Sequence, residues 1–376
     1  MQMLLNPLTG QPKRGRDGSL YGVDASGRVW PLRPFGFIDS HGRAIPVIKG
    51  AAASALIFCD SFDHYANITL MQRKWTQVPG GGAIVAGRNG NGFQGGATSS
   101  PSLTFGPTFT KLCCGTAYNT QSFSNWISVF NDIVSGGLVG LHHVGDGRVF
   151  VASNFGNQSP FSTFTMLQNQ WYYFELQVTS SPPNVLYEVR ANGGTILSGS
   201  FLGGALNFNQ LLMILPGGGL TAIIDDLYVT DGEFLGDVNI ACLYPNAAGD
   251  NSAWTPFVAG ANYLQVKEHS PDDFTTYNSS SAINQQDLYN MDNITGFFGT
   301  IKGAQALWCV ARSAAGVGSV KGALKSGTTT IFDSEYFPSD VSWLYERAPY
   351  RTSPFTTLDW TVPEINALQQ GIKRIT

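Results

Sequence analysis

The acidic residues of this chain are the first candidates for chemistry, because two carboxyl groups can share general acid and base roles. The close pairs are Asp225-Asp226, with Asp231 nearby, and Asp272-Asp273. Glycoside hydrolysis needs two carboxyl groups roughly 5–10 Å apart across a cleft. Ile223–Val229 has the composition of a β-strand, and adjacent strand residues point to opposite faces, so Asp225 and Asp226 fail as such a pair. Calcium near Asp225, Asp226 or Asp231 stays open, because hard cations take carboxylate oxygens.

Other chemical patterns are incomplete. His142 and His143 precede Asp146, but in a strand the two imidazoles face opposite ways and cannot hold one ion. Gly90–Gly95 fits a dinucleotide-binding pattern, yet no helix follows it. Glu175 has no partner carboxyl group on its strand, and no metalloprotease, serine hydrolase or P-loop motif occurs. We therefore predict no catalytic residue, no cofactor and no metal, and we expect that the protein is not an enzyme.

Aromatic side chains are the remaining candidates for a binding site. Sugar-binding β-sandwiches stack sugar rings on Trp or Tyr, and Trp126, Tyr118, Trp254 and Tyr277 could serve. Aromatic residues within strands more often belong to the core, so exposure decides between these two roles.

Composition excludes several classes of protein. The chain has 376 residues, 43% of them hydrophobic, which predicts two or three domains with real cores. A net charge of −4 without a basic stripe argues against nucleic-acid binding. We find no signal peptide and no apolar run long enough to span a membrane. Five cysteines without metal-ligand spacing suggest reduced, buried thiols and folding in a reducing cytosol.

The elements that must position these residues are strands. Between Leu56 and Val229 about eleven strand-like runs alternate with Gly, Pro, Asn and Ser, which is typical of a β-sandwich. A second series follows and includes Val238–Tyr244, Tyr263–Glu268, Ala304–Arg312 and Val341–Arg347. The end is different: Thr361 as N-cap, Pro363 in the first turn and Ile365, Leu368, Ile372 and Ile375 at helical spacing predict one amphipathic helix.

The first 50 residues contain a repeat. Asp24-Ala-Ser-Gly-Arg28-Val-Trp30-Pro31 recurs fifteen residues later as Asp39-Ser-His-Gly-Arg43-Ala-Ile45-Pro46. Asp and Gly give turn chemistry, and each Pro limits the strand that follows to an edge position. Such small units bury too little surface to be stable by themselves. We predict that this arm anchors the protein to a larger assembly through Arg28, Trp30, Pro31, Arg43, Ile45 and Pro46; a floppy leader is the alternative.

One longer pattern carries a family resemblance. It joins Ile224-Asp225-Asp226-Leu-Tyr228, Gly236-Asp237-Val238 and Asp250-Asn-Ser-Ala-Trp254-Thr-Pro256, and earlier pieces are Gly87-Arg88-Asn-Gly-Asn-Gly-Phe93 and Trp171–Leu176. The whole resembles bacteriophage virion structural proteins, in which a laminin-G/concanavalin-like jelly roll precedes a C-terminal β domain. The resemblance covers roughly Leu56 to Ile375.

The expected organisation follows from these patterns. We predict an all-β protein with an N-terminal anchoring arm (1–50), a laminin-G/concanavalin-like jelly roll (51–235) and a smaller β domain with a terminal helix (236–376). The resemblance implies a component of a phage particle, made in the bacterial cytoplasm and attached to tail or head. Its implied partners are other virion proteins, such as tail, portal or capsid proteins, further copies of itself in a trimer, and host-surface glycan. A lectin-like module and a glycan depolymerase are the alternatives.

Overall fold

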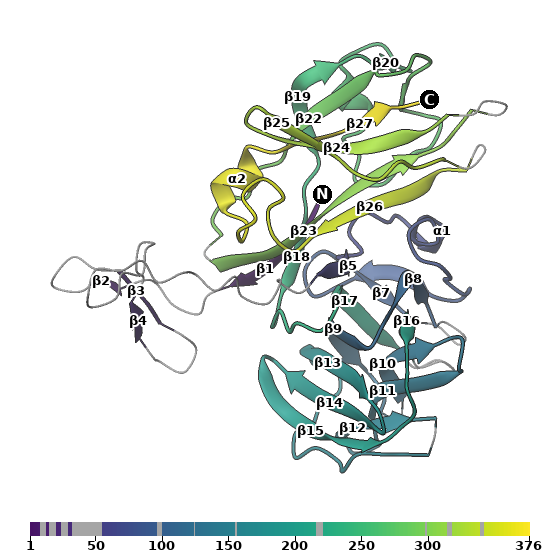
Figure 1. Cartoon of the computed structure of the whole chain (residues 1–376), viewed down its shortest axis with the longest axis vertical. Coiled ribbons are helices and arrows are strands. Elements are labelled where there is room, and N and C mark those ends of the chain that lie inside the picture. The colour runs from purple at the N-terminus through teal and green to yellow at the C-terminus, as the bar shows by residue number, and fades with distance from the viewer. Residues whose placement is uncertain are drawn as a thin grey trace.

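The computed structural model confirms an all-β fold (Figure 1). The structure describes residues 55–376 apart from 96–99, 124, 155, 216–220, 298, 314–317 and 339–341, and, before residue 55, residues 1–7, 13–14, 20–23 and 29–31. In the described part of the chain, no helix is long and apolar enough to cross a membrane. Two β-sandwiches lie one above the other in Figure 1, with the chain's middle part below and its last third above.

The lower sandwich is the predicted jelly roll, and all its strand pairs are antiparallel. Its larger sheet has the order β15-β14-β13-β9-β17-β7-β6, with β5 paired to β17, and its smaller sheet has the order β12-β11-β10-β16-β8. The larger sheet comprises β5 (Leu56–Asp60), β6 (Ala83–Ala86), β7 (Asn91–Gln94), β9 (Lys111–Thr120), β13 (Tyr172–Ser181), β14 (Asn184–Ala191), β15 (Gly194–Leu202) and β17 (Ala222–Thr230). The smaller sheet comprises β8 (Ser102–Phe109), β10 (Asn125–Asp132), β11 (Gly137–His143), β12 (Val149–Ser153) and β16 (Phe208–Leu212). A short helix, α1 (Ile68–Met71), follows β5.

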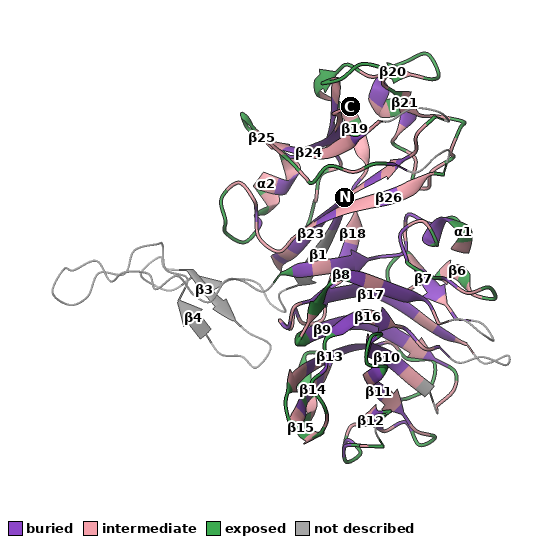
Figure 2. Cartoon of the chain, turned by 45° about the vertical axis from the view of Figure 1, so that its right-hand side comes forward, coloured by how far each residue is buried: buried purple, intermediate pink, exposed green. Residues whose placement is uncertain are grey.

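Alternation along the strands builds the core of this sandwich. In β14, Val185, Tyr187 and Val189 are buried, whereas Leu186 between them is 44% exposed. The turn into β15 is made by Asn192 and Gly193, both with positive φ, as the Asn-Gly pair predicts. Buried side chains of both sheets form one large cluster between them, seen as purple inner faces in Figure 2. This core fixes the sheets and so determines where the connecting loops emerge.

The upper sandwich also has two sheets. Their strand orders are β18-β1-β23-β26 and β19-β22-β27-β24-β25. The first sheet comprises β1 (Gln2–Pro7), β18 (Asn239–Cys242), β23 (Gly299–Val310) and β26 (Leu344–Tyr350). The second comprises β19 (Pro245–Ser252), β22 (Gln286–Met291), β24 (Val320–Ser326), β25 (Thr329–Phe332) and β27 (Gln369–Arg374). A small ribbon of β20 (Thr255–Pro256) and β21 (Asn278–Ser279) and a single 3-10 turn, η1 (Asn262–Gln265), lie in the long connection before β22.

The start of the chain differs from the predicted arm. Gln2–Pro7 forms β1, which pairs with β18 on one side and β23 on the other, so it belongs to the upper sandwich. A three-stranded sheet follows, made of β2 (Lys13–Arg14), β3 (Leu20–Val23) and β4 (Val29–Pro31), and β4 contains Trp30 and Pro31. The other proposed anchoring residues, Arg28, Arg43, Ile45 and Pro46, lie outside the described residues.

Two predicted elements of the last third are wrong in extent or type. The helix begins as predicted, with the Thr361 side chain accepting a bond from the Glu364 backbone, but α2 (Val362–Asn366) ends after five residues and the chain finishes as β27. A Cβ on Gly371 would lie 1.9 Å from the backbone oxygen of Asp287, so glycine permits the close approach of β27 to β22. The predicted strand at Tyr263–Glu268 is instead η1 and a loop.

A buried polar cluster joins the two sandwiches. We call Asp60, Lys74, Gln2 and Gln305 the Asp60 cluster. The Lys74 ammonium lies 3.4 Å from Asp60 and donates to the Gln2 side chain at 2.8 Å, and Gln305 donates to the same Gln2 oxygen at 3.0 Å. Asp60 also accepts bonds from Tyr65 at 2.7 Å and from the Trp75 indole at 2.8 Å.

The four residues of the Asp60 cluster are buried, with at most 3% of their surface exposed. Burial opposes ionisation of Asp60, yet Lys74 and the donated bonds hold the pKa of this carboxyl below its usual value. Because Gln2 and Gln305 come from the upper sandwich and Asp60 and Lys74 from the lower one, the cluster fixes the two domains to each other.

Candidate functional site

The Asp225-Asp226 pair is where the structure first departs from the strand argument. Asp226 adopts a positive φ of 48°, and the pairing of β17 with β9 shifts register between Asp225 and Tyr228. This bulge lets both carboxylates reach the hairpin that carries Arg88. Asp225 accepts bonds from the backbone N–H groups of Arg88 and Asn89 at 2.8 and 3.0 Å. The prediction that the two carboxylates face opposite ways is therefore wrong.

Arg88 connects four of the five pieces of the long sequence pattern, whereas Ala253 and Trp254 of the fifth piece are bonded to Asp287. The Arg88 guanidinium donates to Asp226 at 2.8 and 3.0 Å, to Asp237 at 2.6 Å and to Asn239 at 2.7 Å, and it lies over the Tyr173 ring. Asp226 also accepts the backbone N–H of Ile240 at 2.6 Å. The pattern thus encodes a structural junction that ties the end of the jelly roll to the first strand of the next domain.

These carboxylates are engaged by donors rather than free for catalysis or calcium. Burial, followed by the charge of Asp226, raises the pKa of Asp225 to about 8. Asp231 accepts the backbone N–H of Ala55 at 2.7 Å. Among the described residues, no group of three or more His, Cys, Asp or Glu side chains is placed to hold a metal ion.

The remaining sequence candidates of the jelly roll belong to its packing. His143 is fully buried, its Nε2 lies 2.9 Å from the Tyr118 hydroxyl, and burial lowers its pKa to about 3, so it is neutral. His142 packs edge-to-face on Trp126 at 5.1 Å. Glu175 is buried, accepts the Gly236 N–H at 2.7 Å and is also bonded by the Tyr228 hydroxyl. Because Tyr118 is fully buried in the core of the jelly roll, it is not a sugar platform.

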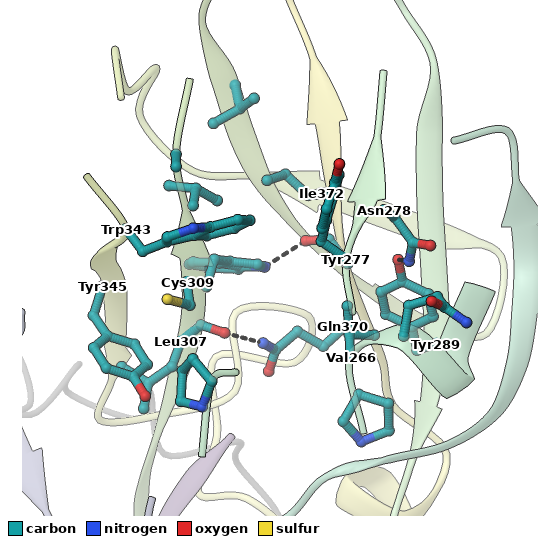
Figure 3. A pocket seen from close by; sticks show the side chains of 18 of the residues that line it. Val266, Tyr277, Asn278, Tyr289, Leu307, Cys309, Trp343, Tyr345, Gln370 and Ile372 are labelled. Carbon is teal, nitrogen blue, oxygen red and sulfur yellow. Dashed lines mark hydrogen bonds between the residues drawn. The ribbon is translucent and has the colours of Figure 1, made fainter. Parts of the chain in front are cut away.

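A cavity of about 410 Å³ lies between the two sheets of the upper sandwich (Figure 3). Its walls come from β22, β23 and β27, from Trp343 and Tyr345 beside or in β26, and from the long connection that carries Tyr277 and Asn278. This volume is in the usual range of small-molecule sites. Two of the predicted aromatic residues, Trp254 and Tyr277, line it. We call it the domain-2 cavity.

One buried carboxylate holds the connection in place over the domain-2 cavity. Asp287 of β22 accepts the backbone N–H groups of Ala253 and Trp254 at 2.7 and 2.8 Å and the side chain of Asn262 at 2.7 Å. Tyr289 donates to the same carboxylate at 2.9 Å and accepts a bond from Asn278 at 2.9 Å. These bonds fix one wall of the cavity before any ligand arrives.

Aromatic rings dominate another part of the wall. Trp343 lies 5.7 Å from Phe274 and 6.1 Å from Tyr277, measured between ring centroids. Tyr277 stacks on Phe257 at 4.5 Å with 17° between the ring planes. Such rings offer flat apolar surface and leave the N–H and O–H groups of Trp and Tyr for polar contacts.

Several buried polar atoms of the wall have no partner in the structure. They include the indole Nε1 of Trp343, the side-chain oxygen of Gln370 and the side-chain oxygen of Asn278. The amide nitrogen of Gln370 is bonded to the Leu307 carbonyl at 2.5 Å, so the orientation of this amide is fixed (Figure 3). An unpaired buried donor or acceptor costs about 1–3 kcal/mol, so a donor and two acceptors around one cavity point to a polar ligand.

The described wall of the domain-2 cavity carries charged groups of both signs, namely Glu268, Asp273, Arg312 and Arg374. Asp273 accepts a bidentate pair of bonds from Arg73 at 2.5 and 2.8 Å. Burial, and after it the neighbouring Asp272, raises the pKa of Glu268 to about 7, so this carboxyl is partly neutral at physiological pH. The cavity therefore combines aromatic faces with hydrogen-bonding and charged groups, which suits a hydroxyl-rich molecule.

Sequence reasoning missed most of this cavity. Glu268, Asn278, Trp343 and Gln370 stand in four separate segments, and the motif search gives no reason to group them. Of the residues that the sequence singles out, Trp254, Tyr277 and Asp273 of the Asp272-Asp273 pair lie in the cavity wall. The 3-10 turn and loop in place of the predicted strand at Tyr263–Glu268 depend on Asp287, which lies far along the chain.

Comparison with known proteins gives likeness in structure only. No protein-family model matches the chain. No curated protein matches it. The fold is similar to domain 4 of AbnA, a GH43 extracellular arabinanase from Geobacillus stearothermophilus, in complex with arabinotriose, at 15% identity and a TM-score of 0.34 over 48% of this chain and 93% of that one.

Two further structures are similar at the same level. One is a native heptameric SAP-like pentraxin from Limulus polyphemus, at 15% identity and a TM-score of 0.30 over 37% of this chain and 75% of that one. The other is the catalytic domain of a glycoside hydrolase family 131 protein from Coprinopsis cinerea, at 8% identity and a TM-score of 0.35 over 49% of this chain and 98% of that one. The likeness is one of β-sandwich architecture.

One expectation is corrected by these comparisons. The sequence was interpreted as that of a protein that is not an enzyme, but solved structures of similar architecture include a glycoside hydrolase catalytic domain. The exclusion is therefore wrong, and enzymatic activity is not excluded.

Proposed function

We propose that the protein binds carbohydrate in the domain-2 cavity. The observation that carries this proposal is the combination of aromatic walls with unpaired donors and acceptors around one cavity. Sugar rings have apolar C–H faces that pack on aromatic rings and hydroxyl groups that act as both donors and acceptors. The Trp343 N–H and the oxygens of Gln370 and Asn278 would be satisfied by such hydroxyls.

The test is a glycan array with the intact protein, followed by titration calorimetry on the strongest ligand. Trp343→Ala should weaken binding at least about tenfold, because it removes one aromatic wall and one unpaired donor. Trp126→Ala is the matched control, since Trp126 is a partly buried indole of the jelly roll that packs on His142. Loss of binding in the control with retention in the Trp343 variant would move the site to the jelly roll, and a negative array at high multivalency would contradict carbohydrate binding.

Hydrolysis is tested on the glycan that the array identifies. Incubation of the bound glycan with the protein and measurement of new reducing ends distinguishes a glycan depolymerase from a lectin. Glu268→Gln is the informative variant for any activity found, because Glu268 is the cavity carboxyl with a pKa near neutrality.

We further propose that the protein is a component of a bacteriophage particle. The observation that favours this is the long sequence pattern, four of whose five parts meet at Arg88. Its proposed partners are tail, portal or capsid proteins and further copies of itself in a trimer. Quantitative mass spectrometry of separated heads and tails tests the proposal: hundreds of copies with heads would mean decoration, a few dozen or fewer with tails would mean an appendage, and absence from particles would overturn it.

The anchoring role of the arm needs a test that spares β1. Replacement of residues 10–49 by a Gly/Ser linker leaves Gln2–Pro7 in its sheet. If the arm anchors the protein, this variant should fold normally and be missing from particles. Normal incorporation would contradict the anchoring role of Arg28, Trp30, Pro31, Arg43, Ile45 and Pro46.

A further inference from the structure

A row of aromatic side chains continues from the domain-2 cavity to the outside. Phe274, Trp343, Tyr277 and Phe257 follow one another with ring centroids 5.7, 6.1 and 4.5 Å apart. Phe274, Trp343 and Tyr277 line the cavity, whereas Phe257 is not part of its wall. The row therefore crosses the boundary between the cavity and the surface beside it.

Packing does not explain this aromatic row. None of its four members belongs to the hydrophobic clusters that form the cores of the described residues. Phe257 is 57% exposed and Phe274 is 60% exposed. Contiguous exposed apolar surface next to a cavity marks a binding surface, while single exposed apolar residues need no explanation.

The backbone holds the outer end of the row rigidly. The Phe257 N–H donates to the Tyr277 carbonyl at 2.9 Å, beside the ribbon of β20 and β21. The neighbouring Val258 N–H donates to the Gln265 side chain at 3.2 Å, which ties the same segment to η1. The stack on Tyr277 and the bonded backbone restrain Phe257 before binding, so this side chain loses little conformational freedom when an apolar group packs on it.

Resting on the proposed carbohydrate binding, we infer that the domain-2 cavity takes one end of a chain of linked sugars, with the aromatic row as the platform for the sugars that follow. Successive ring planes are inclined by 66° and 57°, and Tyr277 and Phe257 stack face to face, so the row is a stepped apolar surface that is longer than a single sugar. The class of ligand is then an oligosaccharide or polysaccharide, and a free monosaccharide fills only the inner part of the site. Phe257 is the platform residue outside the cavity wall, and Trp343 is a platform residue within it.

The experiment measures affinity against chain length. The probe is a ladder of one to six sugars cut from the polysaccharide that gives the strongest array signal, titrated into the full chain by calorimetry. The wild type should gain affinity with each added sugar until the platform is covered. Phe257→Ala should leave the affinity for the single sugar unchanged and reduce that for the longest oligosaccharide at least about fivefold, which corresponds to the loss of one stacking contact.

Phe161→Ala is the matched control, because Phe161 is a phenylalanine of the jelly roll that is 40% exposed. Its ring contacts Phe150, and the Arg148 guanidinium lies over it. Equal affinity for one and six sugars, or a Phe257 variant that keeps the full gain with length, would overturn this inference and leave carbohydrate binding intact. Failure of every member of the ladder together with a negative array would instead overturn the proposed function itself.

Discussion

The Asp60 cluster, between the two sandwiches, and the domain-2 cavity, within the upper one, are both polar regions, but they differ in how completely their groups are paired. In the Asp60 cluster the ammonium of Lys74, the carboxylate of Asp60 and the amide of Gln2 all have partners within 3.4 Å. In the cavity wall, atoms of Trp343 and Gln370 have none. The first arrangement is complete without a ligand, whereas the second becomes complete only when a ligand is bound.

The difference separates structural from functional polar groups in a chain with few recognisable motifs. A buried charge that is fully paired is costly to disturb, because removal of one partner leaves the other without compensation. A buried polar atom without a partner is already destabilising, so its removal should cost little stability and should affect binding instead. Four predictions test this contrast.

Lys74→Met should give the largest effect. It leaves the Asp60 carboxylate buried without its cation, and we expect a loss of about 3–5 kcal/mol in the free energy of unfolding, measured by urea denaturation. Lys267→Met is the matched control, because Lys267 is exposed, and it should change stability by no more than about 0.5 kcal/mol. Equal values for the two variants would show that the Asp60 cluster does not hold the domains together.

Arg88→Met should give the second largest loss in the free energy of unfolding. Asp226 and Asp237 lose their shared cation, and since Arg88 is partly exposed we expect a loss of about 2–3 kcal/mol. Arg148→Met is the control: it removes a solvent-exposed pair with Asp146 and should change stability far less than Arg88→Met. A cost for Arg88 as low as that for Arg148 would mean that the junction made by the long pattern has no role in stability.

Trp343→Phe should affect binding more than stability. It keeps an aromatic ring but removes the unpaired N–H, so the melting temperature should stay the same or rise while affinity for the glycan falls roughly three- to tenfold. Differential scanning calorimetry and titration calorimetry on the same preparation measure both. A drop in melting temperature with unchanged affinity would place this N–H among the structural groups.

Glu268→Gln should have the smallest effect, visible in the pH dependence of stability. The folded pKa of about 7 lies above the ordinary value of 4.5, so the folded protein binds the extra proton between these values. The contribution of this group to stability is therefore complete below pH 4.5 and is lost as the pH rises to 7. Because the side chain is partly exposed, we expect a difference of about 1 kcal/mol or less between pH 5 and pH 7.5, absent in the Gln variant. The same slope in both proteins would contradict this assignment.

Local patterns predicted the fold well where contacts are local. Asn184–Ala191 forms β14, because its alternation and the Asn-Gly turn that follows it are contained in a dozen residues. The end of the chain shows the limit of such patterns. Ile365, Leu368 and Ile372 have helical spacing, but the helix stops at Asn366 because Gly371 and its neighbours pair with β22 and β24.

The domain-2 cavity could not be derived from sequence for the same reason. Its wall depends on Asp287, whose carboxylate is bonded to Ala253 and Trp254, 34 and 33 residues earlier. The bulge at Asp226 likewise depends on Arg88, 138 residues away. Tyr277 could be named as a candidate sugar platform, but its pairing with Trp343 and Phe257 becomes visible only in three dimensions.

The position of β1 also has a consequence for biosynthesis. Gln2 pairs with Cys242 and with Gln305, which is 303 residues further along the chain. At synthesis rates of about 5–20 residues per second, β1 waits roughly 15–60 s before its second neighbour has been made. The jelly roll, whose last strand ends at Thr230, is translated completely within that interval. The lower sandwich can therefore close while the ribosome is still at work, whereas the upper one, and with it the cavity, is assembled last.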